Sequence, residues 1–171
     1  MTDKIYNIAL LGAGRIGQVH AANIAAHPLS RLSTVVDPQE GIARQLAEAY
    51  GASVRSLEDA LSSSDIDAIV IASATSTHAD LIERGIRAGK AVFCEKPVDL
   101  SISRVNATLE AIKGQENRLF VAFNRRFDPA VAELKRRLDA GVIGDLELVT
   151  VVSKDPGALP IDYIKVSGGM F

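Results

Sequence analysis

The sequence of 171 residues contains one cysteine, no tryptophan and no uninterrupted apolar run longer than five residues. The single thiol, Cys94, excludes an intramolecular disulfide and a metal site built from several cysteines. The short apolar runs exclude a membrane-spanning helix, which needs about 20 apolar residues. Positive charge is not in excess, since 19 Lys and Arg stand against 21 Asp and Glu, so no basic surface favours nucleic acid.

The composition is that of a globular protein, because 47% of the residues are hydrophobic and 23% are charged. The N-terminal segment Met1-Thr2-Asp3-Lys4 lacks the charged region, apolar core and cleavage site of a secretory signal. We therefore expect a cytoplasmic protein. A chain of 171 residues has room for one ordinary domain and the beginning of another.

Short apolar strands alternate with amphipathic helices over the first 124 residues. Such strands are almost continuously apolar when helices cover both faces of a parallel sheet. They are predicted at residues 5–11, 32–36, 52–54, 67–72, 91–94 and 119–123, with a helix in each of the five intervals. The alternation predicts an α/β fold with a doubly wound parallel sheet.

The pattern changes near residue 125. Asp128-Pro129 is typical of a helix start, and residues 146–153 alternate partly between apolar and polar, as in an antiparallel sheet with one open face. We therefore predict a first domain at 1–124 and the beginning of a second at 125–171. A lone strand leaves its backbone groups unpaired. For this reason we expect the sequence to be the N-terminal part of a longer chain.

A glycine-rich turn follows the first predicted strand and opens a helix. Gly12, Gly14 and Gly17 match the pattern G-x-G-x-x-G, with Arg15 and Ile16 between the last two. These glycines permit a tight turn, close approach of the backbone to a pyrophosphate, and close packing of helix on strand. The five residues are thus predicted to bind a dinucleotide in a Rossmann domain. The alternative is a glycine-rich turn without a ligand.

Asp37 lies twenty positions beyond Gly17, at the end of the second predicted strand. Its carboxylate is predicted to accept hydrogen bonds from both hydroxyls of an adenosine ribose, and its charge would repel a 2′-phosphate. Pro38 and Gln39 supply no cation for such a phosphate. Asp37 therefore favours NAD over NADP. Alternatively it caps the following helix, and one carboxylate can serve both purposes.

Polar residues follow the other strands at the edge of the sheet where ligands of such folds bind. Lys96 is predicted to be an acid/base or electrostatic catalytic group, and a solvated lysine paired with Glu95 is the alternative. Cys94 has no activating histidine placed by the sequence, so we expect it to pack. We predict no metal site. The candidate cofactor-binding residues at this edge are Ser73, Thr75, His78, Glu95, Lys96, Asn124 and Arg125.

The glycine loop together with His20, Thr77-His78 and Glu95-Lys96-Pro97 resembles the family of glucose-fructose oxidoreductase and inositol 2-dehydrogenase, often called GFO/IDH/MocA. Residues 123–129 and 163–171 are especially similar to its bacterial inositol 2-dehydrogenase branch. The resemblance implies an NAD(P)-binding Rossmann domain followed by an α+β substrate domain with a mainly antiparallel sheet. It also implies hydride transfer from a polyol or sugar hydroxyl to NAD, and a homodimer or homotetramer when the chain is full length.

The family resemblance also implies roles for single residues. The lysine matching Lys96 contacts the substrate hydroxyl, and a histidine with a nearby aspartate follows the Ser-Gly-Gly segment. The sequence ends at Phe171, just short of these two residues, so we expect little turnover from it alone. His20 and His27 are expected to pack or cap the first helix, whereas His78 either borders the dinucleotide or serves the start of its helix.

Two other functions stay open. The first is a non-catalytic dinucleotide-binding module that senses NAD or pairs with another chain through residues 146–153. The second is a Rossmann methyltransferase, against which Lys96 and the strand of the second domain argue.

Overall fold

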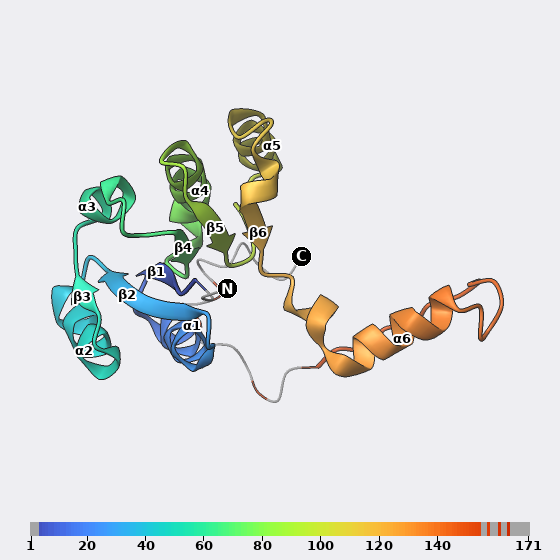
Figure 1. Cartoon of the computed structure of the whole chain (residues 1–171). Helices are drawn as coiled ribbons and strands as arrows, with labels where there is room; N and C mark the ends of the chain where they lie inside the picture. The colour runs from blue at the N-terminus through green and yellow to red at the C-terminus, as the bar shows by residue number, and fades with distance from the viewer. Residues whose placement is uncertain (1–3, 155–156, 158–160, 162–163, 165–171) are drawn as a thin grey trace. The chain divides into compact units, whose positions relative to one another are not determined.

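The computed structural model describes residues 4–154, 157, 161 and 164, and the chain divides into two units, residues 1–122 and 123–171. The described part of the first unit holds one six-stranded sheet and five α-helices (Figure 1). The strands are β1 (Tyr6–Leu11), β2 (Ser30–Val36), β3 (Ser53–Val54), β4 (Ala68–Ile71), β5 (Ala91–Cys94) and β6 (Leu119–Val121). The helices are α1 (Arg15–Ala26), α2 (Glu40–Tyr50), α3 (Leu57–Ser62), α4 (His78–Arg87) and α5 (Ile102–Ala111).

The strands lie in the order β3-β2-β1-β4-β5-β6, and every neighbouring pair is parallel. This is the strand order of Rossmann domains, in which the direction of winding reverses between β1 and β4. The predicted doubly wound parallel sheet is therefore confirmed. Ligands of such sheets bind beyond the carboxyl ends of the strands at this reversal.

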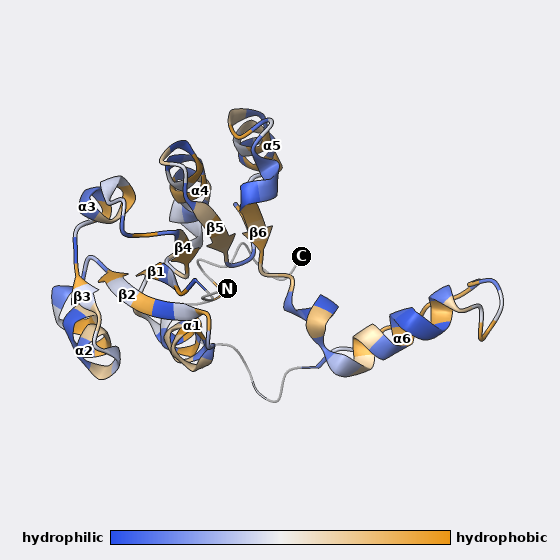
Figure 2. Cartoon of the chain, in the orientation of Figure 1, coloured by the Kyte–Doolittle hydropathy of each residue, from blue (hydrophilic) through white to orange (hydrophobic). Residues whose placement is uncertain are grey.

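Both faces of the central strands are covered, which explains why β1, β4 and β5 consist mostly of apolar residues. Ile8 and Leu10 of β1 pack into a cluster with residues of α1 and α2, whereas Ala9 and Leu11 pack into a second cluster with residues of α3 and α4. Figure 1 shows α1 and α2 on one side of the sheet and α3, α4 and α5 on the other. In Figure 2, β4, β5 and β6 are hydrophobic along most of their length.

Local capping signals set several helix starts. The Ser56 hydroxyl accepts a hydrogen bond from the Asp59 backbone N–H at 3.1 Å and so caps α3. The alternative that Asp37 caps the following helix is wrong, because α2 begins at Glu40 and its N-cap is Gln39. Instead, Asp37 Oδ1 accepts a hydrogen bond from the Gln39 N–H at 2.8 Å, which is a turn ahead of the helix.

The second unit contains a 3₁₀ turn, η3 (Asn124–Phe127), and the helix α6 (Pro129–Asp139). Asp128 caps α6 by accepting hydrogen bonds from the N–H groups of Ala130 at 2.9 Å and Val131 at 3.2 Å, as predicted. The strand predicted at 146–153 is wrong, because these residues form no strand and Leu148 is 83% exposed. Alternation alone does not make a strand, since the backbone also needs a neighbouring strand to pair with.

Two sequence predictions are left without a structural outcome. The segment 163–171, which resembles inositol 2-dehydrogenases, lies outside the described residues apart from Ile164. The assignment of residues 125–171 to a substrate domain also stays a prediction. Among the residues that the structure describes, no helix has the length and apolar character needed to cross a bilayer.

Candidate functional site

The glycine loop is fixed between the ends of β1, β2 and β4. Gly12 has a φ of +102°, which L side chains rarely adopt, and its N–H donates to the Val36 carbonyl at 2.8 Å. A Cβ on Gly12 would also lie 2.6 Å from the carbonyl carbon and oxygen of Ala72. A Cβ on Gly17 would lie 2.0 Å from the Gly12 carbonyl oxygen. Gly12 and Gly17 are therefore required by the fold itself.

Gly14 differs from these two glycines. Its φ of −69° suits any residue, and a Cβ there would meet no atom within 4 Å. No side chain caps α1, which Gly14 precedes, and its first turn holds no acidic residue. The N–H groups of this turn, which includes the exposed Arg15 and the half-buried Ile16, thus have no capping side chain at the positive end of the helix dipole. This arrangement fits a pyrophosphate lying against the backbone.

A pocket of about 580 Å³ opens beside the glycine loop, at the carboxyl ends of β1 to β4. Asp37 forms part of its wall, and its Oδ2 accepts a hydrogen bond from the Ala13 N–H at 2.8 Å. Each carboxylate oxygen of Asp37 thus accepts one backbone bond and keeps a further lone pair for a ribose hydroxyl. The pocket brings together three residues that the sequence predicts: Gly12, Asp37 and Ser73.

The same pocket is also lined by residues that are not among the predicted site residues. Arg55, Ser56 and Leu57 contribute from the turn after β3, and Asp80 and Leu81 contribute from α4. Arg55, Ser56 and Leu57 directly follow the third predicted strand, residues 52–54, so the binding of ligands beyond strand ends is the signal that indicates them.

The loop after β4 is held by hydroxyl groups. The Ser73 and Thr77 hydroxyl oxygens lie 2.7 Å apart, and Thr77 Oγ1 donates to the Ala74 carbonyl at 2.7 Å. Ser73 and Thr77 both line the pocket. Thr75 opens the 3₁₀ turn η1 (Thr75–Thr77), is half-buried and is not part of the pocket wall. The predicted contact of Thr75 with a cofactor stays a prediction.

His78 joins two loops at the edge of the sheet. The residue is 2% exposed, its Nδ1 lies 2.7 Å from the Pro97 carbonyl oxygen, and its Nε2 lies 3.1 Å from the Ser73 carbonyl oxygen. Both ring nitrogens therefore contact backbone oxygens. His78 positions the loops after β4 and β5, and its predicted direct contact with a cofactor stays a prediction.

Glu95 and Lys96 have different surroundings. Glu95 Oε1 lies 2.8 Å from His20 Nε2, and the His20 ring meets Phe93 edge to face at 5.2 Å. His20 thus packs, as predicted, and in addition ties α1 to the loop after β5. Lys96 is exposed, and its ammonium group has no partner among residues 4–154. In particular, it forms no ion pair with Glu95, so its charge is available to a ligand.

Cys94 is fully buried at the end of β5, and its thiol donates to the Glu95 carbonyl at 3.2 Å. Burial, and then the negative charge of Glu95, raise the pKa of the Cys94 thiol to about 12. A thiol of this kind is a poor nucleophile at neutral pH, so the predicted packing role is confirmed. Within the described residues, no group of three or more His, Cys, Asp and Glu could hold a metal ion.

Asn124 and Arg125 belong to the second unit. They form the start of η3, and Arg125 Nη1 lies 3.9 Å from Asp128 Oδ2 at an exposed position. The predicted contact of both residues with a cofactor stays a prediction.

The strand order and the glycine loop define a Rossmann domain of the dinucleotide-binding class. The GFO/IDH/MocA family, described as an oxidoreductase family with an NAD-binding Rossmann fold, matches residues 6–123. The chain belongs to this family. The resemblance that the glycine loop and Glu95-Lys96-Pro97 indicate is therefore confirmed.

Relatives and solved structures agree with this assignment. The chain is 51% identical over 162 residues to inositol 2-dehydrogenase of Rhizobium meliloti (strain 1021), covering 95% of this chain and 49% of the relative. A myo-inositol dehydrogenase structure from Corynebacterium glutamicum ATCC 13032 has 47% identity and a TM-score of 0.91, covering 97% of this chain and 50% of that one. A scyllo-inositol dehydrogenase from Lactobacillus casei, with bound NAD(H) and scyllo-inositol, has 32% identity and a TM-score of 0.78, covering 83% and 43%. The chain spans about half the length of these proteins.

Proposed function

We propose that the protein is an NAD-dependent inositol 2-dehydrogenase and that residues 4–122 bind its coenzyme. The observation that carries the proposal is the lysine ammonium of Lys96, which has no partner within residues 4–154 and lies at the same sheet edge as the glycine loop. The 51% identity to an inositol 2-dehydrogenase supports inositol, with its axial hydroxyl, as the substrate. The negative charge of Asp37 supports NAD over NADP.

The edge of the sheet offers a separate place for each part of a dinucleotide. Asp37 and its pocket lie beyond the ends of β1 to β4, and would hold the adenosine half. The open space at Gly14 and the start of α1 would hold the pyrophosphate. Lys96 follows β5, on the other side of β4, and would lie at the nicotinamide half. The residues present thus fit the coenzyme along its length.

The proposed reaction removes a hydride from the carbon that bears the substrate hydroxyl and a proton from its oxygen. When bound, NAD supplies a nicotinamide ring that accepts the hydride. Negative charge develops on the substrate oxygen as its proton leaves, and the Lys96 ammonium stabilises that charge. Each histidine of the described part already has a hydrogen-bond partner: His20 has Glu95, His27 has the Leu29 N–H, and His78 has two carbonyls. We therefore assign the proton to the histidine that the family resemblance implies after the Ser-Gly-Gly segment, which would act as general base.

The experiment is a turnover assay of the full-length gene product with myo-inositol and NAD, followed by the absorbance of NADH. Replacing Lys96 by methionine is expected to lower kcat by about a hundredfold or more, because one charge that stabilises the transition state is lost. The melting temperature is expected to stay the same, since the Lys96 side chain forms no hydrogen bond or ion pair with residues 4–154. Lys96→Arg is the control that keeps the charge. Unchanged turnover in Lys96→Met would contradict the assigned role.

The same assay separates this proposal from a non-catalytic NAD-binding module. Binding of NAD without oxidation of any inositol or sugar would favour the module. Preferential binding of S-adenosylmethionine would favour a methyltransferase. As part of the proposal, we expect a homodimer or homotetramer, which rests on the family resemblance, and a cytoplasmic location, which rests on the sequence of the N-terminal segment.

A further inference from the structure

The pocket that contains Asp37 has a single cation among its described lining residues, which is Arg55. The Arg55 backbone N–H donates to the Val35 carbonyl at 3.3 Å, so its main chain lies beside the end of β2, close to where Asp37 follows. An arginine at this point has a side chain long enough to turn toward the ribose end of the pocket. Guanidinium groups bind phosphate through paired hydrogen bonds.

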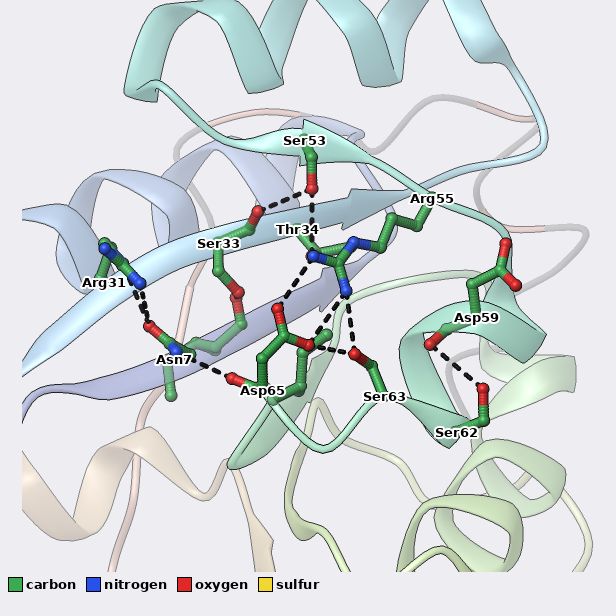
Figure 3. Close-up of polar contacts among 12 residues, drawn as sticks. Asn7, Arg31, Ser33, Thr34, Ser53, Arg55, Asp59, Ser62, Ser63 and Asp65 are labelled. Atoms are coloured by element: carbon green, nitrogen blue, oxygen red, sulfur yellow. Dashed lines mark hydrogen bonds and ion pairs between the residues drawn. The ribbon is translucent and has the colours of Figure 1, made fainter.

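The guanidinium of Arg55 is bound elsewhere, however. It donates from Nη1 to Asp65 Oδ1 at 3.1 Å and from Nη2 to Asp65 Oδ2 at 2.9 Å, which is a paired contact. Nη1 also donates to the Ser63 hydroxyl oxygen at 3.1 Å, and that hydroxyl donates in turn to Asp65. Figure 3 shows Ser63 and Asp65 on the same side of the guanidinium. We call these three residues the Arg55 cluster.

The contacts within the Arg55 cluster are charge-assisted. Hydrogen bonds from Arg55 and then from Ser63 hold the pKa of the Asp65 carboxyl well below its usual range, so Asp65 is ionised at neutral pH. A carboxylate that meets both arms of a guanidinium fixes its orientation as well as its charge. Arg55 also borders a second cavity, lined by Arg31, Ser53 and Asp65 among others.

We propose that Ser63 and Asp65 determine coenzyme specificity by holding Arg55 away from the ribose end of the Asp37 pocket. Asp37 repels a 2′-phosphate, and the Arg55 cluster withholds the cation that would otherwise bind one. Ser63 and Asp65 are thus positioning residues that act through Arg55. The inference rests on the proposed function, because it requires the adenosine ribose of the coenzyme to lie at Asp37.

The test is a set of dissociation constants for NAD and NADP, measured by calorimetry on the full-length gene product. Because Asp37 itself repels a 2′-phosphate, the comparison is made in the Asp37→Ser background. Adding Asp65→Asn to Asp37→Ser is expected to tighten NADP binding about tenfold, the value of one charge-assisted hydrogen bond. The dissociation constant of NAD is expected to be equal in the Asp37→Ser variant and in the Asp37→Ser, Asp65→Asn double variant.

Two further variants test whether the gain in NADP affinity comes from Arg55. Adding Arg55→Gln to the double variant is expected to remove the gain in NADP affinity. Glu110→Gln in the Asp37→Ser background is the matched control, since it also removes one exposed carboxylate from an ion pair, with Lys113 at 3.0 Å, but lies on α5 away from the pocket. We expect no gain in NADP affinity from this control.

The possible results separate the two proposals. If the wild-type protein binds neither coenzyme, the proposed function fails. If it binds NAD and Asp65→Asn brings no gain for NADP, or if Glu110→Gln brings the same gain, the role of the Arg55 cluster is overturned. Should Asp65→Asn fail to fold, Ser63→Ala in the Asp37→Ser background is expected to give a smaller gain, and no gain there overturns the inference equally.

Discussion

The proposed coenzyme site runs along one edge of the sheet, and the two ends of this site are built differently. At the end formed by β1 and β2, Gly12, Gly17 and Asp37 are each in close contact with backbone atoms of neighbouring segments. At the end formed by β5, Lys96 extends from the loop without a side-chain partner among the described residues. At the first end the same residues support the fold and would bind the ligand, whereas at the second the proposed chemistry depends on a side chain that the fold does not need.

The largest effect on stability is expected from Gly17→Ala at the first end. Its new methyl group would lie 2.0 Å from the Gly12 carbonyl oxygen, so α1 or the glycine loop must move. We expect the free energy of unfolding to fall by about 3 kcal/mol, as in overpacked cores. Urea denaturation followed by circular dichroism measures it. Gly41→Ala on α2, where an added Cβ meets nothing within 4 Å, is the control and is expected to be neutral or slightly stabilising.

An intermediate effect is expected from His78→Leu, which cuts the connection between the two loops that follow β4 and β5. Two backbone carbonyls, of Ser73 and Pro97, would lose their imidazole partner, which is expected to lower the free energy of unfolding by about 2 kcal/mol. Amide hydrogen exchange is expected to accelerate around Lys96. His27→Leu, at an exposed position, is the control. Equal stability of the two variants would show that the connection does not hold the loops.

The smallest effect on stability is expected from Asp37→Asn. The amide of asparagine keeps one acceptor oxygen, so only one of the two backbone N–H donors, of Ala13 and Gln39, loses its partner. We expect a loss of about 1 kcal/mol in unfolding free energy and about tenfold in NAD affinity, measured by calorimetry. Asp139→Asn on the exposed face of α6 is the control. A normal affinity for NAD in Asp37→Asn would place the ribose elsewhere.

Most of the fold could be predicted because its elements depend on local patterns. The strand at Ala91–Cys94 was predicted at its observed bounds, since a run covered on both faces needs only to be apolar and short. Ser56 and Asp128 cap helices through residues two or three positions away. The failure at 146–153 has the opposite cause, because pairing with another strand depends on residues that no local pattern specifies.

The candidate site could be predicted only in part, for the same reason. The glycine loop and Asp37 are recognisable from their spacing along the chain. The contact between His20 and Glu95 joins residues 75 positions apart, and it exists because α1 lies near the end of β5. The Arg55 cluster arises where the turn after β3 meets the turn before β4. Sequence spacing carries no information about either meeting point.

The hydrogen bond from the Ala13 N–H to Asp37 bears on the entropy cost of binding a ligand. Together with the bond from Gly12 to Val36, it sets the shape of the glycine loop by contacts within the chain itself. A loop that is already rigid loses little conformational entropy when a ligand arrives. A preformed cradle of this kind would suit the proposed coenzyme, which would be taken up, changed and released once in every turnover.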